Sequence, residues 1–289
     1  MDPIGTARDA ELKQLTDIPI DDVLALLDGE PGDYRSLYYR WEKEQWAAGT
    51  LDLTEDRVEW PSLAPGVRSF LTAQLGWFGL GADRATRWLI PFVDAAPSEE
   101  QQVFLSTQLV DSARHSVLFD RIASEIFEDQ DVWAHLPQRT SEGFKRLVED
   151  LMPDVAQTLL DGSTSSFATG LALEHLVAVD ALGLTLHKAA ITLCDAGPVL
   201  RGIRTGLAAA VRDSTRHVAF TLRFLADATD RDRSVGETVR SALIDSPVGW
   251  DLLREVPCDG LPFTTDDLVE TARARLDRSL MRVGVDPVG

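Results

Sequence analysis

Apolar residues recur at intervals of three and four positions through most long segments of this chain, and alternating apolar and polar runs are nearly absent. The first spacing places apolar side chains on one face of a helix, whereas alternation is typical of a half-buried strand. The pattern therefore predicts an all-α protein. The expected helices span residues 19–28, 34–48, 65–93, 98–128, 139–161, 166–194, 199–229, 234–244 and 264–282.

Four of the longest predicted helices form two pairs. The helices at 65–93 and 98–128 are joined by a short connection, as are those at 166–194 and 199–229, and a longer segment joins pair to pair. This is the plan of a four-helix bundle with one long crossover, whose facing side chains build sites in the core. We expect a single domain over residues 1–289, with the bundle at about 65–229, N-terminal helices within 19–48 and C-terminal helices within 234–282.

The composition narrows the class of protein. With 44% apolar and 26% charged residues, the chain has enough apolar side chains for a core. Its formal net charge of -19 opposes binding to nucleic acid or to anionic membranes, which requires clustered Lys and Arg. Cys194 and Cys258 form no disulfide framework, and the N-terminus lacks the pattern of a signal peptide. We therefore expect a soluble, cytoplasmic protein.

A five-residue word, D-S-x-R-H, occurs in the middle of two predicted helices, at residues 111–115 and 213–217. On a helix, positions three residues apart share a face, so Ser112 lies beside His115 and Ser214 beside His217. Ferritin-like carboxylate proteins carry Glu-x-x-His on such a face, and two helices of this kind contribute to a dinuclear metal centre. Here Ser replaces Glu in both words.

Around these words the sequence resembles the small subunit of class I ribonucleotide reductase and, more closely, the related ligand-binding diiron or manganese–iron oxidases. The resemblance covers roughly residues 40–230. It rests on the two words and on Trp41-Glu42-Lys43, Leu51-Asp52-Leu53-Thr54-Glu55-Asp56-Arg57, Gly81-Ala82-Asp83, Ile90-Pro91-Phe92 and the segment 175–180. It implies a ferritin-like bundle with additional helices at both ends and in the crossover, and a homodimer.

The resemblance also implies where metal ligands would stand. The six ligand positions fall on Ala82, on Ser112 and His115, on either Ala178 or Asp180, and on Ser214 and His217. At least three ligands are therefore missing, and the ordinary dinuclear centre is not expected, because bridging carboxylates hold its two cations together. A single Fe, Mn or Zn ion on His115, His217 and Asp180, with Asp83 as another candidate carboxylate, remains an alternative.

The acids that precede the lost ligands are retained. By the resemblance, Asp111 would pair with His217, and Asp213 with His115. Without a metal, each pair becomes a buried dyad that fixes the imidazole tautomer, raises its basicity and can perform acid/base catalysis. A purely structural polar network is the competing interpretation. Arg114 and Arg216 are expected to point away from this face, in surface or interhelix ion pairs, and His175 could line the cavity.

A true reductase subunit is excluded first. Phe119 occupies the place of the radical-bearing Tyr, and no aromatic residue follows Phe263 in the C-terminal tail. The first hypothesis is an enzyme for a small organic substrate, with metal-independent or single-metal chemistry. In it, His115 and His217 are the acid/base groups, Asp111 and Asp213 orient them, and Ser112 and Ser214 donate hydrogen bonds to a polar ligand. The alternatives are an oxygen-dependent oxidase that uses Asp83 or Asp180, and a non-catalytic ligand-binding or pseudo-enzyme subunit.

Overall fold

The computed structural model describes residues 20–127, 141–197, 200–246 and 250–288. Within these ranges the chain forms helices and no strand, which confirms the all-α prediction. Some predicted helix ends, at residues 19, 128, 139–140 and 199, lie outside the described residues.

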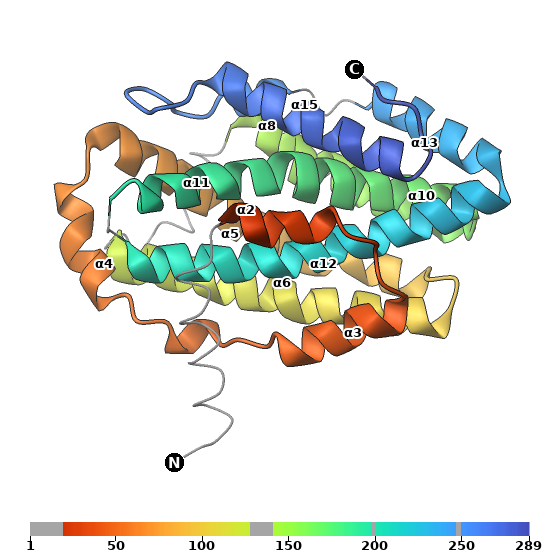
Figure 1. The fold of residues 1–289 in the computed structure, drawn as a ribbon, viewed down its shortest axis with the longest axis horizontal. Helices are drawn as coiled ribbons and strands as arrows, with labels where there is room; N and C mark the ends of the chain where they lie inside the picture. Colours follow the sequence, from red (N-terminus) through yellow and green to blue (C-terminus); the bar gives the residue numbers. More distant parts are fainter. Residues whose placement is uncertain (1–19, 128–140, 198–199, 247–249, 289) are drawn as a thin grey trace, which may run out of the picture.

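Four long helical segments make the centre of the fold (Figure 1). They are α5 (Pro65–Asp94), α6 (Glu99–Ile126), the continuous span Thr164–Asp195, and α12 (Arg201–Arg231). The third segment is composite, because a π-helix (Ala172–Leu184) separates α10 (Thr164–Leu171) from α11 (Thr185–Asp195). In Figure 1, α12 runs between α6 and α11 and contacts both. The predicted four-helix bundle is confirmed, whereas the π-helix was not anticipated.

Shorter elements surround the bundle. They are α2 (Ile20–Leu24), α3 (Tyr34–Lys43), α4 (Thr54–Glu59), α8 (Glu142–Lys145), a second π-helix (Arg146–Leu151), α9 (Met152–Thr158), α13 (Arg233–Ile244), α14 (Asp251–Arg254) and α15 (Thr265–Arg282). The sequence analysis missed α4 and α14. It also extended the helix at 34–48 too far, because α3 ends at Lys43 and the chain beyond it places the Trp46 indole on Asp213 in the core.

The short helix α4 supplies a hydrogen-bond acceptor for the backbone N–H groups at the beginning of α12. The Asp56 carboxylate accepts hydrogen bonds from the backbone N–H groups of Gly202, at 3.0 Å, and Ile203, at 2.7 Å. These are among the N–H groups that a helix cannot pair within itself. Gly202 is required there, because a Cβ at this position would lie 2.3 Å from the carbonyl oxygen of Asp52. The contact fixes the end of α12 against α4.

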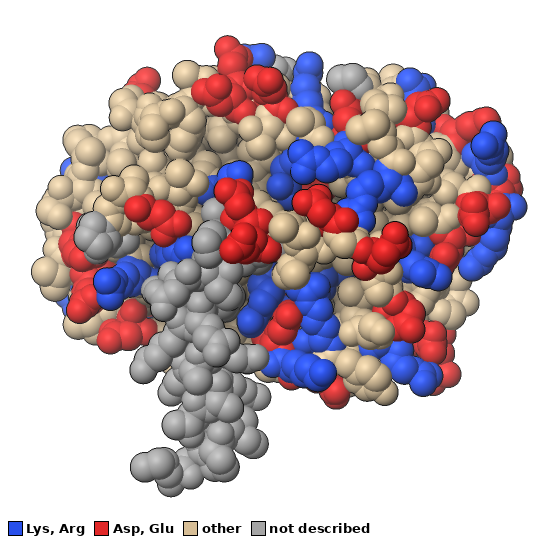
Figure 2. All heavy atoms as spheres, in the orientation of Figure 1, with Lys and Arg blue, Asp and Glu red and all other residues tan. Residues whose placement is uncertain are grey.

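Buried apolar side chains from Leu24 to Val285 form one contiguous cluster. Among the described residues, the span Thr164–Asp195 is long and apolar enough to cross a membrane by length and composition, with a mean hydropathy of 1.5 in its most apolar window. However, 72% of that window is buried against the rest of the fold, as in the core helix of a soluble protein. On the face in Figure 2, acidic and basic side chains are interspersed.

Candidate functional site

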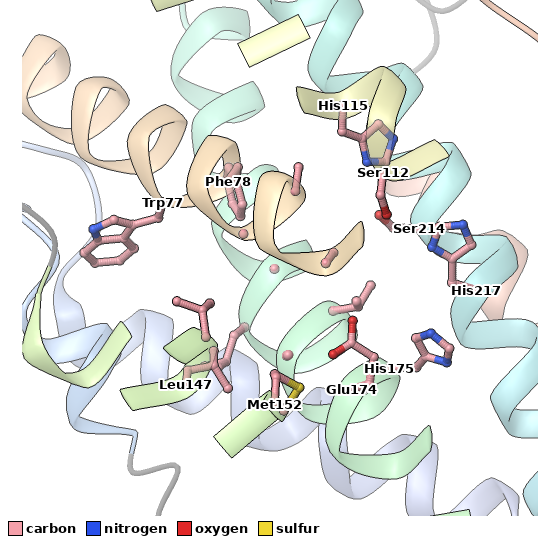
Figure 3. A pocket seen from close by; sticks show the side chains of 18 of the residues that line it. Trp77, Phe78, Ser112, His115, Leu147, Met152, Glu174, His175, Ser214 and His217 are labelled. Carbon is pink, nitrogen blue, oxygen red and sulfur yellow. The ribbon is translucent and has the colours of Figure 1, made fainter. Parts of the chain in front are cut away.

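A cavity of about 150 Å³ lies among α5, α6, the composite helix and α12, and α8 and α9 line a further wall. One side is polar and the opposite side is apolar (Figure 3). The polar lining comprises Gln108, Ser112, His115, Glu174, His175, His187, Ser214 and His217. The apolar lining includes Trp77, Phe78, Trp88, Phe119, Phe144, Leu147, Val148 and Met152. The chain has five histidines, and four of them meet here.

The two D-S-x-R-H words meet across this cavity. Ser112 and His115 reach it from α6, and Ser214 and His217 reach it from α12. Figure 3 shows the two serines next to each other, with the histidines on either side. No hydrogen bond joins either serine hydroxyl to another residue in the described part of the chain. Helical periodicity therefore placed these four side chains on the correct faces.

Each histidine binds the aspartate of the other word. His115 Nε2 lies 3.1 Å from Asp213 Oδ2, and His217 Nε2 lies 3.0 Å from Asp111 Oδ2. The crossed pairing that the resemblance implied is confirmed. Because an ionised carboxylate only accepts hydrogen bonds, Nε2 of each ring carries the proton. In the neutral ring, Nδ1 then keeps its lone pair.

Arg114 and Arg216 join the two aspartates. Arg216 donates to Asp213 Oδ1 at 2.6 Å and to Asp111 Oδ2 at 3.2 Å, and its other terminal nitrogen donates to Glu44 at 2.7 Å. Arg114 lies 3.2 Å from Asp111 and 3.4 Å from Asp213. The pairs Arg114–Asp213 and Arg216–Asp111 are interhelix ion pairs, as expected, whereas Arg114–Asp111 and Arg216–Asp213 each lie within one helix. They are not surface pairs, because the side chain of Arg216 is 0% exposed and that of Arg114 only 9%.

Two tryptophans complete this network. The Trp41 indole donates to Asp111 Oδ1 at 3.0 Å, and the Trp46 indole donates to Asp213 Oδ2 at 2.8 Å. Trp46 also stacks on the His115 ring, with centroids 6.2 Å apart. Both tryptophans come from α3 and the segment after it, so an N-terminal element covers the outer side of the two His–Asp pairs.

Burial and ion pairing act against each other in this cluster. Burial raises the pKa of Asp213, but the Arg216 guanidinium and the His115 hydrogen bond outweigh it, so the pKa lies well below its ordinary value. Burial also lowers the pKa of His217, and the Asp111 hydrogen bond does not fully offset it. The expectation that pairing with Asp111 raises the basicity of the His217 imidazole is therefore wrong, because the loss of water around the imidazolium has the larger effect on its pKa.

The carboxylates expected as substitute metal ligands lie elsewhere. Asp180 Oδ1 binds Arg275 and Oδ2 binds Ser279, at 2.7 Å, both on α15. Asp83 has a side chain 51% exposed and is paired with Arg84. The cavity is instead lined by Ala82 and Ala178. The sequence left two candidate ligand positions on the third bundle helix, Ala178 and Asp180. Ala178 faces the cavity, whereas Asp180 lies two residues later, on nearly the opposite side of the helix.

Glu174 is the acidic residue of the cavity that the sequence analysis missed. It is 6% exposed, and its Oε2 atom has no hydrogen-bond partner. Burial raises its pKa to about 7, an effect only partly opposed by the Trp88 indole. One signal was present in the sequence, because Glu174 is an acid inside an otherwise apolar run and lies one turn before Ala178.

The remaining two histidines differ in their partners. His175 is fully paired, with Nδ1 2.5 Å from Thr221 Oγ1 and Nε2 3.1 Å from Gln108 Oε1. His187 donates from Nδ1 to the Gly183 carbonyl oxygen at 2.8 Å, and its Nε2 has no partner. Burial lowers the pKa of His187 to about 4. His175 lines the cavity as considered from the sequence, and His187 joins it.

The donor atoms of this cavity do not suit a dinuclear Mn/Fe cofactor. At the six positions where the resemblance would place its ligands, with Ala178 on the third helix, the chain has two imidazoles and no carboxylate. Within the described ranges, no group of three or more His, Cys, Asp or Glu residues is spaced to hold a metal ion. Hard, redox-active metals need carboxylate oxygens for charge compensation. Glu174 supplies one carboxylate, on a different turn of the helix from Ala178.

Comparison with solved structures places the fold among R2-like ligand-binding oxidases. The chain aligns with the oxidase from Sulfolobus acidocaldarius at a TM-score of 0.74 and 15% identity, covering 86% of this chain and 89% of that one. A variant of an R2-like ligand-binding oxidase with a reconstituted Mn/Fe cofactor aligns at 0.77 and 17%, covering 87% and 93%. No protein-family model matches the chain. The fold expected from the resemblance is therefore confirmed.

Proposed function

We propose that this protein is an enzyme for a small organic substrate that performs acid/base chemistry in the bundle cavity without a dinuclear metal centre. The observation that carries the proposal is the pair of crossed His–Asp contacts, because they leave the Nδ1 atoms of His115 and His217 for a ligand in the cavity. The hydroxyls of Ser112 and Ser214 lie between the two rings (Figure 3).

We infer the following role for each of these groups. Nδ1 of a neutral His115 or His217 accepts a proton from the substrate, and the paired aspartate stabilises the resulting imidazolium. The second histidine, once protonated, returns a proton at another atom of the substrate. The serine hydroxyls hold the polar group on which charge develops. The surrounding apolar side chains exclude bulk water, which strengthens these interactions.

The test compares substrate consumption by the protein and by His115→Gln and His217→Gln variants. Each protein is incubated with a small-metabolite extract containing a metal chelator, and compounds are followed by mass spectrometry. We expect the wild-type protein to consume one or a few compounds and each variant to lose this activity at least about 100-fold. The exposed Arg35→Met variant is the control. Unchanged consumption by both histidine variants would remove the proposal, and retention of a compound without turnover would favour a non-catalytic binding protein.

The second candidate function is that of an oxygen-dependent oxidase with an unusual ligand set, and the likeness to Mn/Fe oxidase structures favours it. Its test is anaerobic loading with iron and manganese, followed by elemental analysis. Stoichiometric metal that is lost in both His115→Gln and Glu174→Gln would replace the first proposal with this one. In either case we propose a cytoplasmic homodimer that does not bind nucleic acid.

A further inference from the structure

The cavity offers several hydrogen-bond acceptors, and no Lys or Arg is among the described residues that line it. Oε2 of Glu174 and Nε2 of His187 are buried without a partner, as are two N–H donors of the lining, Gln108 Nε2 and Trp88 Nε1. Because Nδ1 of His187 donates to a carbonyl oxygen, its Nε2 holds a lone pair. The Nδ1 atoms of His115 and His217 are acceptors by the same argument. The lining residues include neither Lys nor Arg.

The aromatic wall supplies the second observation. Trp77, Phe78, Trp88 and Phe144 all line the cavity, and the rings of Trp77 and Phe144 stack with centroids 5.7 Å apart. Aromatic faces carry negative electrostatic potential and attract cations, most strongly when water is excluded. Trp88 also lies close enough to the Glu174 carboxyl to affect its ionisation.

These features select among classes of ligand. An anionic ligand would face the Glu174 carboxylate and find no cationic side chain in the cavity wall, which makes its desolvation costly. A metal ion is disfavoured, because the described His, Cys, Asp and Glu residues form no group of three with the spacing of metal ligands. An organic cation with N–H donors satisfies the unpaired acceptors, and its apolar part fits the apolar side of the cavity.

We propose that the cavity binds a small organic ammonium compound, with its N–H groups at the free oxygen of Glu174 and its apolar body against the aromatic wall. This assignment rests on the proposed function, because it names the substrate class of the same cavity. It adds Glu174 as the residue that determines the charge of the ligand. The apolar part of the ligand is held on the side formed by Trp77, Leu147 and Met152 (Figure 3).

The ionisation of Glu174 gives the binding a pH dependence. The titratable groups that share the cavity with it are His175 on the same helix, His187 on α11, His115 on α6 and His217 on α12. Burial lowers the pKa values of His175, His187 and His217, so these rings are neutral at pH 7 and above. Affinity for an ammonium ion should therefore fall as Glu174 is protonated, by roughly tenfold per pH unit below its pKa of about 7.

The experiment uses three probes of matched shape and different charge: 2-phenylethylammonium, 2-phenylethanol and phenylacetate. Binding to the full-length protein is measured by isothermal titration calorimetry at pH 8. We expect the ammonium to bind at least about tenfold more tightly than the alcohol, and the carboxylate to bind most weakly. Phenylacetate binding as tightly as the ammonium would overturn the proposal.

Two variants test the role of the carboxylate. Glu174→Gln keeps the shape of the side chain and removes its charge, and it should weaken ammonium binding by roughly 30-fold or more while leaving the alcohol within about threefold. It should also make the loss of affinity between pH 8 and pH 5.5 smaller than in wild type. Glu270→Gln on α15 removes the same charge from an exposed position and should change neither result. Equal ammonium affinity in wild type and Glu174→Gln would overturn the assignment.

A third variant separates this assignment from the proposed function. In the double variant His115→Gln/His217→Gln, the acid/base groups are lost but Glu174 and the aromatic wall remain. Ammonium binding should persist within about tenfold of wild type. Persistent binding together with wild-type substrate consumption would sink the acid/base proposal and leave the ligand class standing. Loss of the charge preference among the three probes would sink the ligand class alone.

Discussion

The outer side and the cavity side of the two D-S-x-R-H words differ in how their polar atoms are satisfied. On the outer side, each carboxylate oxygen of Asp111 and Asp213 has at least one hydrogen-bond donor or ion-pair partner. On the cavity side, the hydroxyls of Ser112 and Ser214 bond no other described residue. Oε2 of Glu174 is also unpaired. The outer side of these helices therefore has paired carboxylates, whereas the cavity side has polar atoms without a partner.

This difference distinguishes polar groups that stabilise the fold from polar groups that are available to a ligand. A buried polar atom without a partner costs about 1–3 kcal/mol, and most such atoms in folded proteins are paired by protein or by water. The outer network meets this condition for all four carboxylate oxygens with protein groups alone, although Arg216 Nε has no partner. The cavity side meets it only when a ligand or water is bound. Variants on the outer side should therefore affect stability, and those on the cavity side should mainly affect binding.

The largest effect is expected for Arg216→Met in the outer network. This change removes one of the two guanidinium groups that bind both Asp111 and Asp213, and the loss of one partner from a buried ion cluster costs about 3–5 kcal/mol. Arg35→Met removes an exposed ion pair with Glu100 and should cost about 0–1 kcal/mol. Urea unfolding followed by circular dichroism measures both free energies. Similar losses in the two variants would contradict the assignment of the outer network to stability.

The next effect concerns Glu174 and depends on pH. The pKa of Glu174 is about 7 in the fold and has an ordinary value of 4.5, so the folded state holds this proton more tightly. The contribution of Glu174 to the stability of the fold should therefore fall as the pH rises from 4.5 to 7, by about 3 kcal/mol for a shift of this size. Glu174→Gln removes this dependence, and the variant should gain on wild type across the same window.

Unfolding curves at a series of pH values check this expectation, with Glu270→Gln as the control. That exposed acid should leave the pH profile of wild type unchanged. If the difference in unfolding free energy between wild type and Glu174→Gln were constant from pH 4.5 to 8, the carboxyl would not be desolvated in the fold, and its role in binding a cation would lose its basis.

The sequence predicted the bundle and half of the cavity, for a physical reason. Ser112, His115, Ser214 and His217 lie on two long regular helices, where a spacing of three residues fixes a shared face. Their partners across the bundle followed from the resemblance. Such a spacing predicts a shared face only where the segment is an α-helix throughout.

The third helix was unpredictable by the same method. Residues Ala172–Leu184 form a π-helix, in which successive side chains advance by a smaller angle than in an α-helix. On this helix, Ala178 and Glu174 line the cavity while Asp180 binds Arg275. The sequence left the choice between Ala178 and Asp180 open. Long-range contacts such as that of Trp46 with Asp213 were equally inaccessible, because no local pattern encodes them.

The smallest effects compare two hydroxyls on α12, that of Thr221, which has a partner in the protein, and that of Ser214, which bonds no other described residue. The Thr221 hydroxyl lies 2.5 Å from His175 Nδ1, and Thr221→Val keeps the volume while leaving that ring nitrogen buried and unpaired, at a cost of about 1–2 kcal/mol. Ser214→Ala removes a hydroxyl that bonds no other described residue, so unfolding free energy should change by less than about 0.5 kcal/mol. Thermal unfolding of both variants without ligand gives this comparison.

Adding 2-phenylethylammonium should then raise the melting temperature of Thr221→Val as much as that of wild type, whereas Ser214→Ala should respond less, because its hydroxyl faces the ligand. A loss of stability in Ser214→Ala equal to that in Thr221→Val would mean that both hydroxyls serve the fold, and the cavity side would then be as structural as the outer network.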